Sequence, residues 1–151
     1  MNLPNNLTIY FDGAFNSNIA TYSWIICEND PEKPITHGCG EECRGEGATS
    51  NIAEYAAVRN ALSYLKGRNW KGNLTIKGDS KLIIYQLLDD WCCSKVHLAK
   101  LRQQCWNLLD EVAGDSWAAL WIPREENKPC DNLSKSAYEQ ATGIKLKKRK
   151  K

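Results

Sequence analysis

The sequence predicts a single α/β domain with a mixed five-stranded sheet, in which three antiparallel strands are followed by two parallel ones, and with helices on both faces of the sheet. Two observations predict this class. Residues 7–43 carry three β-rich segments, and after them helical periodicity alternates with short β-rich segments. The length of 151 residues suits one domain that buries its own core.

The opening strands follow from alternation. Leu7, Ile9 and Phe11 alternate with more polar neighbours, and a turn at residues 16–18 separates them from a run of β-formers. Glycines weaken the third segment, and Pro123 ends the last one. We expect the strands at residues 7–12, 19–27, 34–43, 74–77 and 117–122.

Four helices are predicted from apolar spacing. Asn51 is expected to cap the first, with Glu54 as the reciprocal member of a capping box, and this helix ends near residue 67. Asp79 or Ser80 caps the second, which points Leu82, Ile83 and Leu87 inward. The third helix covers about residues 95–112, and the fourth about 130–142, after a loop at 124–129.

Charge is unevenly distributed. The net charge is +2, but residues 145–151 carry six of the 20 basic groups, which leaves 14 basic and 18 acidic groups and a net charge of −4 elsewhere. We therefore expect a catalytic or binding domain at 1–143 and a basic tail at 144–151. The tail is either a nucleic-acid contact or a solubilising or localising end.

Seven cysteines, an odd number, lie mostly in apolar segments, which favours reduced thiols over a disulfide framework. Cys39 and Cys43 lack a second ligand pair at zinc-site spacing. No apolar run is long enough to span a membrane, and residues 1–6 do not resemble a secretion signal. We expect a cytoplasmic protein with no membrane partner.

Four acids stand at positions from which they could share one pocket: Asp12, Glu54, Asp79 and Asp131. Each also has an ordinary structural explanation. Asp12 could belong to a hairpin turn with Gly13, Glu54 to the capping box, and the other two could be helix N-caps. Each of the four nevertheless lies at the end of an element or within a strand, where ligands gather in mixed α/β sheets.

Carboxylates that converge without His or Cys favour hard cations. Their mutual repulsion calls for positive charge, and oxygen ligands select Mg²⁺ or Mn²⁺ over zinc. Two such ions about 4 Å apart can activate water and stabilise a leaving oxygen in phosphodiester hydrolysis. The sequence has no Walker-type phosphate loop and no G-x-S-x-G elbow, so this chemistry has no strong competitor.

Four segments together resemble the motifs of the type 1 ribonuclease H family, in its order and at its spacing: residues 9–14 (IYFDGA), 49–55 (TSNIAEY), 77–80 (KGDS) and 123–131 (PREENKPCD). The resemblance implies that family's fold and the hydrolysis of RNA paired with DNA. It also implies that Asp12, Glu54, Asp79 and Asp131 hold the metal ions. Thr49 matches the contact to a DNA phosphate, and Ser50 and Asn51 match the contacts to the minor groove.

The chain also departs from this pattern. Arg124 stands where many members have a loop histidine, as in a subgroup from archaea and some bacteria, and it could bind phosphate or the departing group but not act as a base. An ion pair with Glu125 or Asp115 is its structural alternative. Lys81 replaces a common groove-contacting glutamine, and Ser50 replaces a frequent asparagine.

A basic protrusion found in many bacterial members is missing, because only residues 89–94 fill that interval. The cluster at 145–151 could partly replace it as an electrostatic clamp. We expect a monomer whose partner is an RNA/DNA hybrid. Two alternatives remain: a nuclease of the same fold that acts on DNA, like resolvases and transposases, and a hybrid-binding protein without activity.

Overall fold

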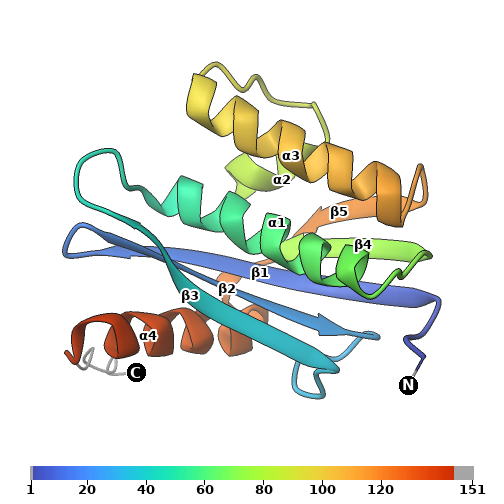
Figure 1. Cartoon of the computed structure of the whole chain (residues 1–151), viewed down its shortest axis with the longest axis horizontal. Helices are drawn as coiled ribbons and strands as arrows, with labels where there is room; N and C mark the ends of the chain where they lie inside the picture. Colours follow the sequence, from blue (N-terminus) through green and yellow to red (C-terminus); the bar gives the residue numbers. More distant parts are fainter. Residues whose placement is uncertain (1, 145–151) are drawn as a thin grey trace.

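The computed structural model describes residues 2–144, with five strands and four α-helices (Figure 1). In chain order the elements are β1 (Asn6–Asn16), β2 (Ile19–Cys27), β3 (Thr36–Arg44), α1 (Ser50–Gly67), β4 (Asn73–Gly78), α2 (Lys81–Leu87), α3 (Val96–Val112), β5 (Trp117–Trp121), the 3-10 turn η1 (Arg124–Glu126) and α4 (Lys128–Thr142). The expected order of elements is confirmed. Of the expected tail at 144–151, residues 145–151 lie outside the described residues.

The sheet has the order β3-β2-β1-β4-β5. β1 pairs with β2, and β2 with β3, in antiparallel fashion, whereas β4 runs parallel to both β1 and β5. The predicted mixed sheet is therefore confirmed. Because β4 runs parallel to β1 and ends at Gly78, its carboxyl end lies beside the middle of β1, and such strand ends are where mixed sheets gather functional groups.

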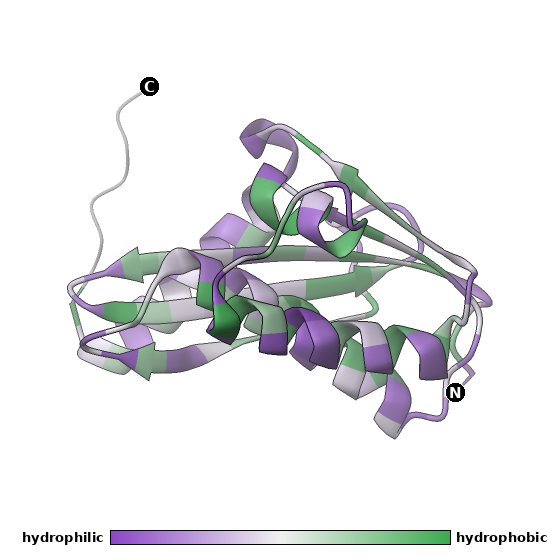
Figure 2. Cartoon of the chain, turned by 90° about the horizontal axis from the view of Figure 1, so that it is seen from above, coloured by the Kyte–Doolittle hydropathy of each residue, from purple (hydrophilic) through white to green (hydrophobic). Residues whose placement is uncertain are grey.

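The two faces of the sheet are covered differently. α1, α2 and α3 lie on one face and α4 lies alone on the other (Figure 1). The first face carries the main apolar core, in which Ile9, Phe11 and Ile76 are fully buried beneath α1. The α4 face holds a smaller cluster around Tyr10 and Cys130. The helices carry both apolar and polar residues (Figure 2), so each buries one side.

Two local predictions were wrong at helix starts, those for α1 and α4, and one of two expected alternatives was selected at α2. Thr49, not Asn51, caps α1: it is extended, and its hydroxyl accepts from the Ile52 N–H at 3.2 Å, so Glu54 belongs to no capping box. Of the two caps expected for α2, the structure has Ser80, and Asp79 is not the cap. α4 begins at Lys128, because Pro129 fits the first turn of a helix, where its missing N–H costs nothing.

Other expectations are confirmed. All seven cysteines are free thiols, which excludes a disulfide framework. Cys27, Cys105 and Cys130 are fully buried, and burial raises the pKa of each thiol, so none of these three is a ready nucleophile. Among residues 2–144, no helix combines the length and the apolar character needed to cross a membrane.

Candidate active site

Strand register places Asp12 and Asp79 beside each other. The last matched pair between β1 and β4 is Tyr10 with Lys77, and each aspartate follows two residues later on its own chain segment. Asp12 is still inside β1, where it pairs with Ser23 of β2, so the hairpin-turn explanation is wrong. β4 ends at Gly78, one residue before Asp79, and the charge of Asp79 acts on Asp12.

Glu54 approaches from α1, on the opposite face from Asp12. It lies in the second turn of that helix, directly over Gly13 of β1. A Cβ atom at position 13 would lie 2.5 Å from the Glu54 backbone nitrogen and 2.6 Å from its Cγ. The missing side chain therefore lets α1 approach the strand, and only glycine fits here.

Asp131 is supplied by the first turn of α4, whose N-cap is Asn127, so Asp131 is not itself the cap. Buried hydroxyls attach this helix to β2. The Ser23 hydroxyl lies 2.6 Å from the Cys130 carbonyl oxygen and 2.7 Å from the Ser134 hydroxyl. Because Ser23 also pairs with Asp12, these bonds hold α4 over the strand position that carries the first acid.

The acids affect one another electrostatically. Asp12 is only 7% exposed; burial, together with the charges of Asp79 and Asp131, raises its pKa to about 7. Burial and the charges of Asp12 and Asp79 raise the pKa of Glu54 to about 8. Hydrogen bonding by Ser134 and Ser80, respectively, only partly opposes these shifts. The four predicted acids thus form one interacting set, which uncompensated negative charge destabilises.

Two cations already face Asp131. Arg124 lies 3.6 Å from Oδ1 and Lys135 lies 3.1 Å from Oδ2. The expected alternative for Arg124, an ion pair with Glu125 or Asp115, is wrong, because the guanidinium faces the acidic set instead. Among residues 2–144, no three His, Cys, Asp or Glu side chains form a ready-made metal group.

Asn127 is a site residue that the sequence analysis missed. It is 1% exposed, and its Nδ2 donates both to the Phe11 carbonyl and to Asp79 Oδ1, each at 2.9 Å. It therefore bridges the gap between β1 and the end of β4. Its Oδ1 is buried without a hydrogen-bond partner among residues 2–144, which is costly. The motif at 123–131 contained this residue, but as a loop position.

The predicted substrate contacts lie around this set. Thr49 and Ser50 start α1, one turn before Glu54, and no acid occupies the first turn of that helix. Asn51 follows in the same turn, and all three are partly exposed. Lys81 is the exposed first residue of α2, two positions after Asp79. The structure therefore puts these residues on the two helix starts nearest the acids.

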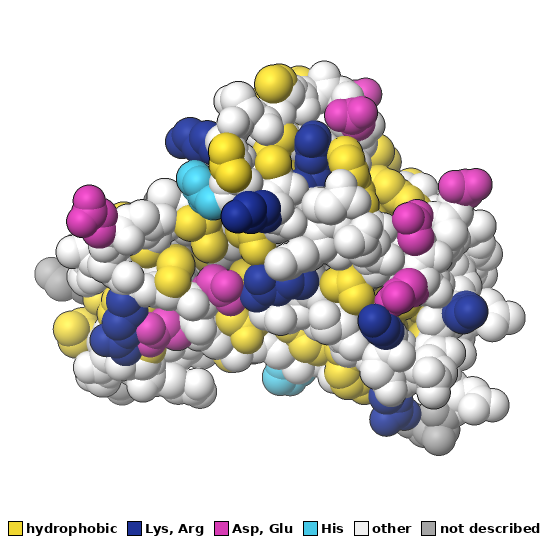
Figure 3. All heavy atoms as spheres, turned by 45° about the horizontal axis from the view of Figure 1, so that its top comes forward, with side chains coloured by type: hydrophobic (Ala, Val, Ile, Leu, Met, Phe, Trp, Pro, Cys, Tyr) yellow, Lys and Arg dark blue, Asp and Glu magenta, His cyan; other side chains and the backbone are white. Residues whose placement is uncertain are grey.

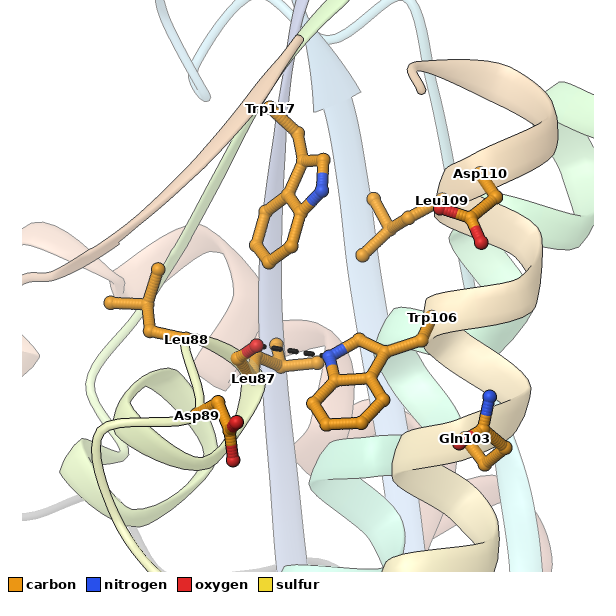
Figure 4. Close-up of a pocket in the computed structure, with 8 residues that line it drawn as sticks. All are labelled: Leu87, Leu88, Asp89, Gln103, Trp106, Leu109, Asp110 and Trp117. Carbon is orange, nitrogen blue, oxygen red and sulfur yellow. Dashed lines mark hydrogen bonds between the residues drawn. The ribbon is translucent and has the colours of Figure 1, made fainter. Parts of the chain in front are cut away.

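A hollow in the surface is lined by none of the four candidate acids. About 440 Å³ in volume, it is formed between the end of α2, α3 and the start of β5 (Figure 4). Trp106 and Trp117 face into it, and the Trp106 indole donates to the Leu87 carbonyl at 2.9 Å. Trp117 stands at the opposite end of β5 from Gly78 and Asp79. On the face in Figure 3, basic and acidic groups are interspersed without one dominant basic patch.

Comparisons with known proteins agree with this geometry. Residues 10–137 match the family model described as Reverse transcriptase-like. The chain is 30% identical to Ribonuclease HI of Halobacterium salinarum over 134 residues, which cover 87% of this chain and 64% of that protein. It thus spans less than two thirds of this curated relative.

Solved structures share the fold. RNase H1 from Halobacterium salinarum NRC-1 superposes with a TM-score of 0.78 at 28% identity, covering 89% of this chain and 98% of that one. LC11-RNase H1, solved in complex with an RNA/DNA hybrid, superposes with a TM-score of 0.80 at 22% identity, covering 90% of this chain and 99% of that one. With the family match spanning most of the domain, the chain belongs to the Reverse transcriptase-like family and, within it, to the type 1 ribonuclease H proteins.

Proposed function

We propose that this protein hydrolyses the RNA strand of RNA/DNA hybrids as an endonuclease, leaving 5′-phosphate and 3′-hydroxyl ends. The observation that carries the proposal is the interacting acidic set beside the carboxyl end of β4 and the adjacent part of β1, in which burial and mutual repulsion raise the pKa values of Asp12 and Glu54. The relative named Ribonuclease HI and the hybrid-bound LC11-RNase H1 supply the choice of substrate.

The residues fit a pair of hard divalent cations. The donors are all carboxylate oxygens, and among them Asp12 and Glu54 are the ones whose charged forms most need a cation. We assign Asp12, Glu54, Asp79 and Asp131 as the side chains that would hold Mg²⁺ or Mn²⁺. Such ions would activate a water and stabilise the departing oxygen when bound.

The chain's own groups would position the substrate around the ions. The partly exposed start of α1 and the Thr49 side chain suit a phosphate, because a helix N-terminus attracts anions. Ser50 and Asn51 are placed to contact the minor groove, where the 2′-hydroxyl distinguishes RNA from DNA. Arg124 would neutralise a phosphate or the departing strand through its guanidinium donors.

We infer that the unit responsible is residues 1–143, acting as a monomer, with 144–151 as an appended basic tail. The described residues support the first part. α4 covers one face of the sheet and ends at Thr142, and Gly143 follows in the left-handed conformation. Deletion of residues 145–151 tests the second part, because loss of a phosphate clamp raises KM and flattens the salt dependence of binding.

The experiment that tests the proposed function compares labelled RNA/DNA, RNA/RNA and DNA/DNA duplexes of one sequence with Mg²⁺ or Mn²⁺, using the unaltered chain and Asp79→Asn. We expect cleavage of the hybrid alone, abolished in the variant. Cleavage of duplex DNA would instead support a resolvase-like or transposase-like nuclease. Binding of the hybrid without cleavage would support the non-catalytic alternative.

A further inference from the structure

Trp121 joins two parts of the candidate site. It ends β5, next to Gly78 in the sheet, and its indole N–H donates to the backbone carbonyl of Asp79 at 3.1 Å. The ammonium of Lys81 lies 4.8 Å from the centroid of the same ring. One side chain therefore contacts both the backbone of a candidate metal ligand and the side chain of a candidate substrate contact.

The two contacts use different parts of the indole. The N–H can only donate, and it is used by the carbonyl of Asp79. The electron-rich face attracts a cation, and Lys81 occupies it. Trp121 is still 39% exposed, which is high for so large an apolar side chain next to a core. Burial is thus not what places this tryptophan here.

Lys81 is an exposed residue at the start of α2. Within residues 2–144, no salt bridge joins it to a carboxylate, although acids lie close by at the site. A flexible ammonium that is held on an aromatic face loses less freedom on binding an anion than one that is free in solvent. The geometry therefore gives a preorganised cation beside the acidic set, with no internal anion.

We propose that Trp121 is a positioning residue that holds the Lys81 ammonium for a phosphate of the bound nucleic acid, next to Asp79. The proposal rests on the proposed function and deepens it: Lys81 contacts the sugar-phosphate backbone rather than a base edge. A lysine only donates, whereas a glutamine both donates and accepts, so the change at this position favours an anion over the mixed pattern of a groove.

The salt dependence of hybrid binding, measured in EDTA so that no cleavage occurs, tests this inference. Each phosphate contact contributes about 0.7–0.9 to the slope of log affinity against log salt. In Lys81→Gln we expect the slope to fall by that amount, so that the affinity lost between 50 and 200 mM salt becomes about threefold smaller. Lys77→Gln is the matched control, because its ammonium also faces an aromatic ring, that of Tyr10, at 5.8 Å.

Variants of Trp121 separate its two contacts. Trp121→Leu removes the aromatic face and should lower the slope as Lys81→Gln does, and the double variant should show no further loss. Trp121→Phe keeps a face for the ammonium and should keep the slope, but it loses the bond to Asp79 and should lower kcat. Circular dichroism and thermal melting confirm that each variant is folded.

The outcomes distinguish this inference from the proposed function. An unchanged slope in Lys81→Gln or in Trp121→Leu, in a protein whose unaltered form binds and cuts the hybrid, overturns the inference alone. Additive losses in the double variant also overturn it, since Trp121 would then act independently of Lys81. If the unaltered chain binds no hybrid or leaves it uncut, the proposed function itself fails.

Discussion

The two faces of the central sheet are built for different purposes. On the face covered by α1, α2 and α3, the alternate β1 residues Leu7, Ile9 and Phe11 are buried in a large apolar core. On the face covered by α4, their neighbours Thr8, Tyr10 and Asp12 are also buried, yet the contacts there include hydroxyls and carboxylates. The same strand thus contributes apolar burial on one side and polar chemistry on the other.

The α4 face is where the protein gives up stability. Burial of apolar surface contributes about 25 cal/mol per Å², whereas a buried carboxylate without a cation opposes folding. Thr21, Ser23 and Ser134 are all buried on the α4 face, where they hydrogen-bond between β2 and α4. The α4 face is therefore held by directional bonds that position Asp12 and Asp131, and the apolar face supplies the stability that this arrangement requires.

The largest expected effect tests the apolar face. Ile9→Ala, at a fully buried position, should lower the free energy of unfolding by about 2–5 kcal/mol, since it leaves a cavity beneath α1. Below the melting transition kcat should stay near its original value, because no site residue is touched. Urea denaturation and hydrolysis rates at low temperature measure the two quantities. A large fall in kcat with unchanged stability would contradict the conclusion that the apolar face supplies stability while the α4 face positions the acids.

Asp12→Asn should have the opposite effects: a large loss of activity and a gain in stability. Cleavage should fall more than about 100-fold, as a ligand loss exceeds the 10–100-fold typical of groups behind the ligands. In EDTA at pH 8, however, the variant should be more stable, by on the order of 1–3 kcal/mol, because the amide needs no counter-charge. Thermal melting of both proteins decides the sign, and a less stable variant at pH 8 would refute the electrostatic explanation.

The pH dependence of stability follows from the same shifts. The folded pKa values, about 7 for Asp12 and about 8 for Glu54, lie above the values near 4 of an unfolded chain. The folded protein therefore binds more protons, and the stability that this gives is fully present below about pH 4 and is lost as the pH rises through 7 to 8. In metal-free buffer Asp12→Asn should lose less stability over this range, and parallel curves for the two proteins would count against the shift.

Asn127→Ala should lower kcat by about 10–100-fold with a smaller change in KM, because Asp79 loses the bond that orients it. The buried Phe11 carbonyl also loses its donor, so a moderate loss of stability is expected. Asn132→Ala, at an exposed position of α4, is the matched control. Equal kinetics for the two variants would show that Asn127 does not position the acid.

The sequence was sufficient for the elements whose pattern is local. The run of β-formers at 19–27 has the observed bounds of β2, and the four acidic motifs were recognised as candidates. It was insufficient where two residues could cap the same helix, and where the role of a residue depends on the tertiary fold. Thr49 and Asn51 are both good caps, and the backbone entering α1 selected Thr49. Asn127 gave no local signal, because its role exists only once β1 and β4 diverge beside α4.

The smallest expected effect concerns the cations already beside Asp131. Lys135 lies 3.1 Å from Oδ2 on the partly exposed surface of α4, and such pairs are worth about 0.2–1 kcal/mol. If Asp131 is a metal ligand, Lys135→Gln frees it, and the Mg²⁺ concentration for half-maximal cleavage should fall by about 1.5–5-fold. Lys66→Gln, which removes the exposed pair with Glu111, should leave that concentration unchanged. If that Mg²⁺ concentration instead rises in Lys135→Gln, the lysine helps to hold substrate. The positive charge on the α4 face would then serve to contact the nucleic acid rather than to neutralise the acids of the free protein.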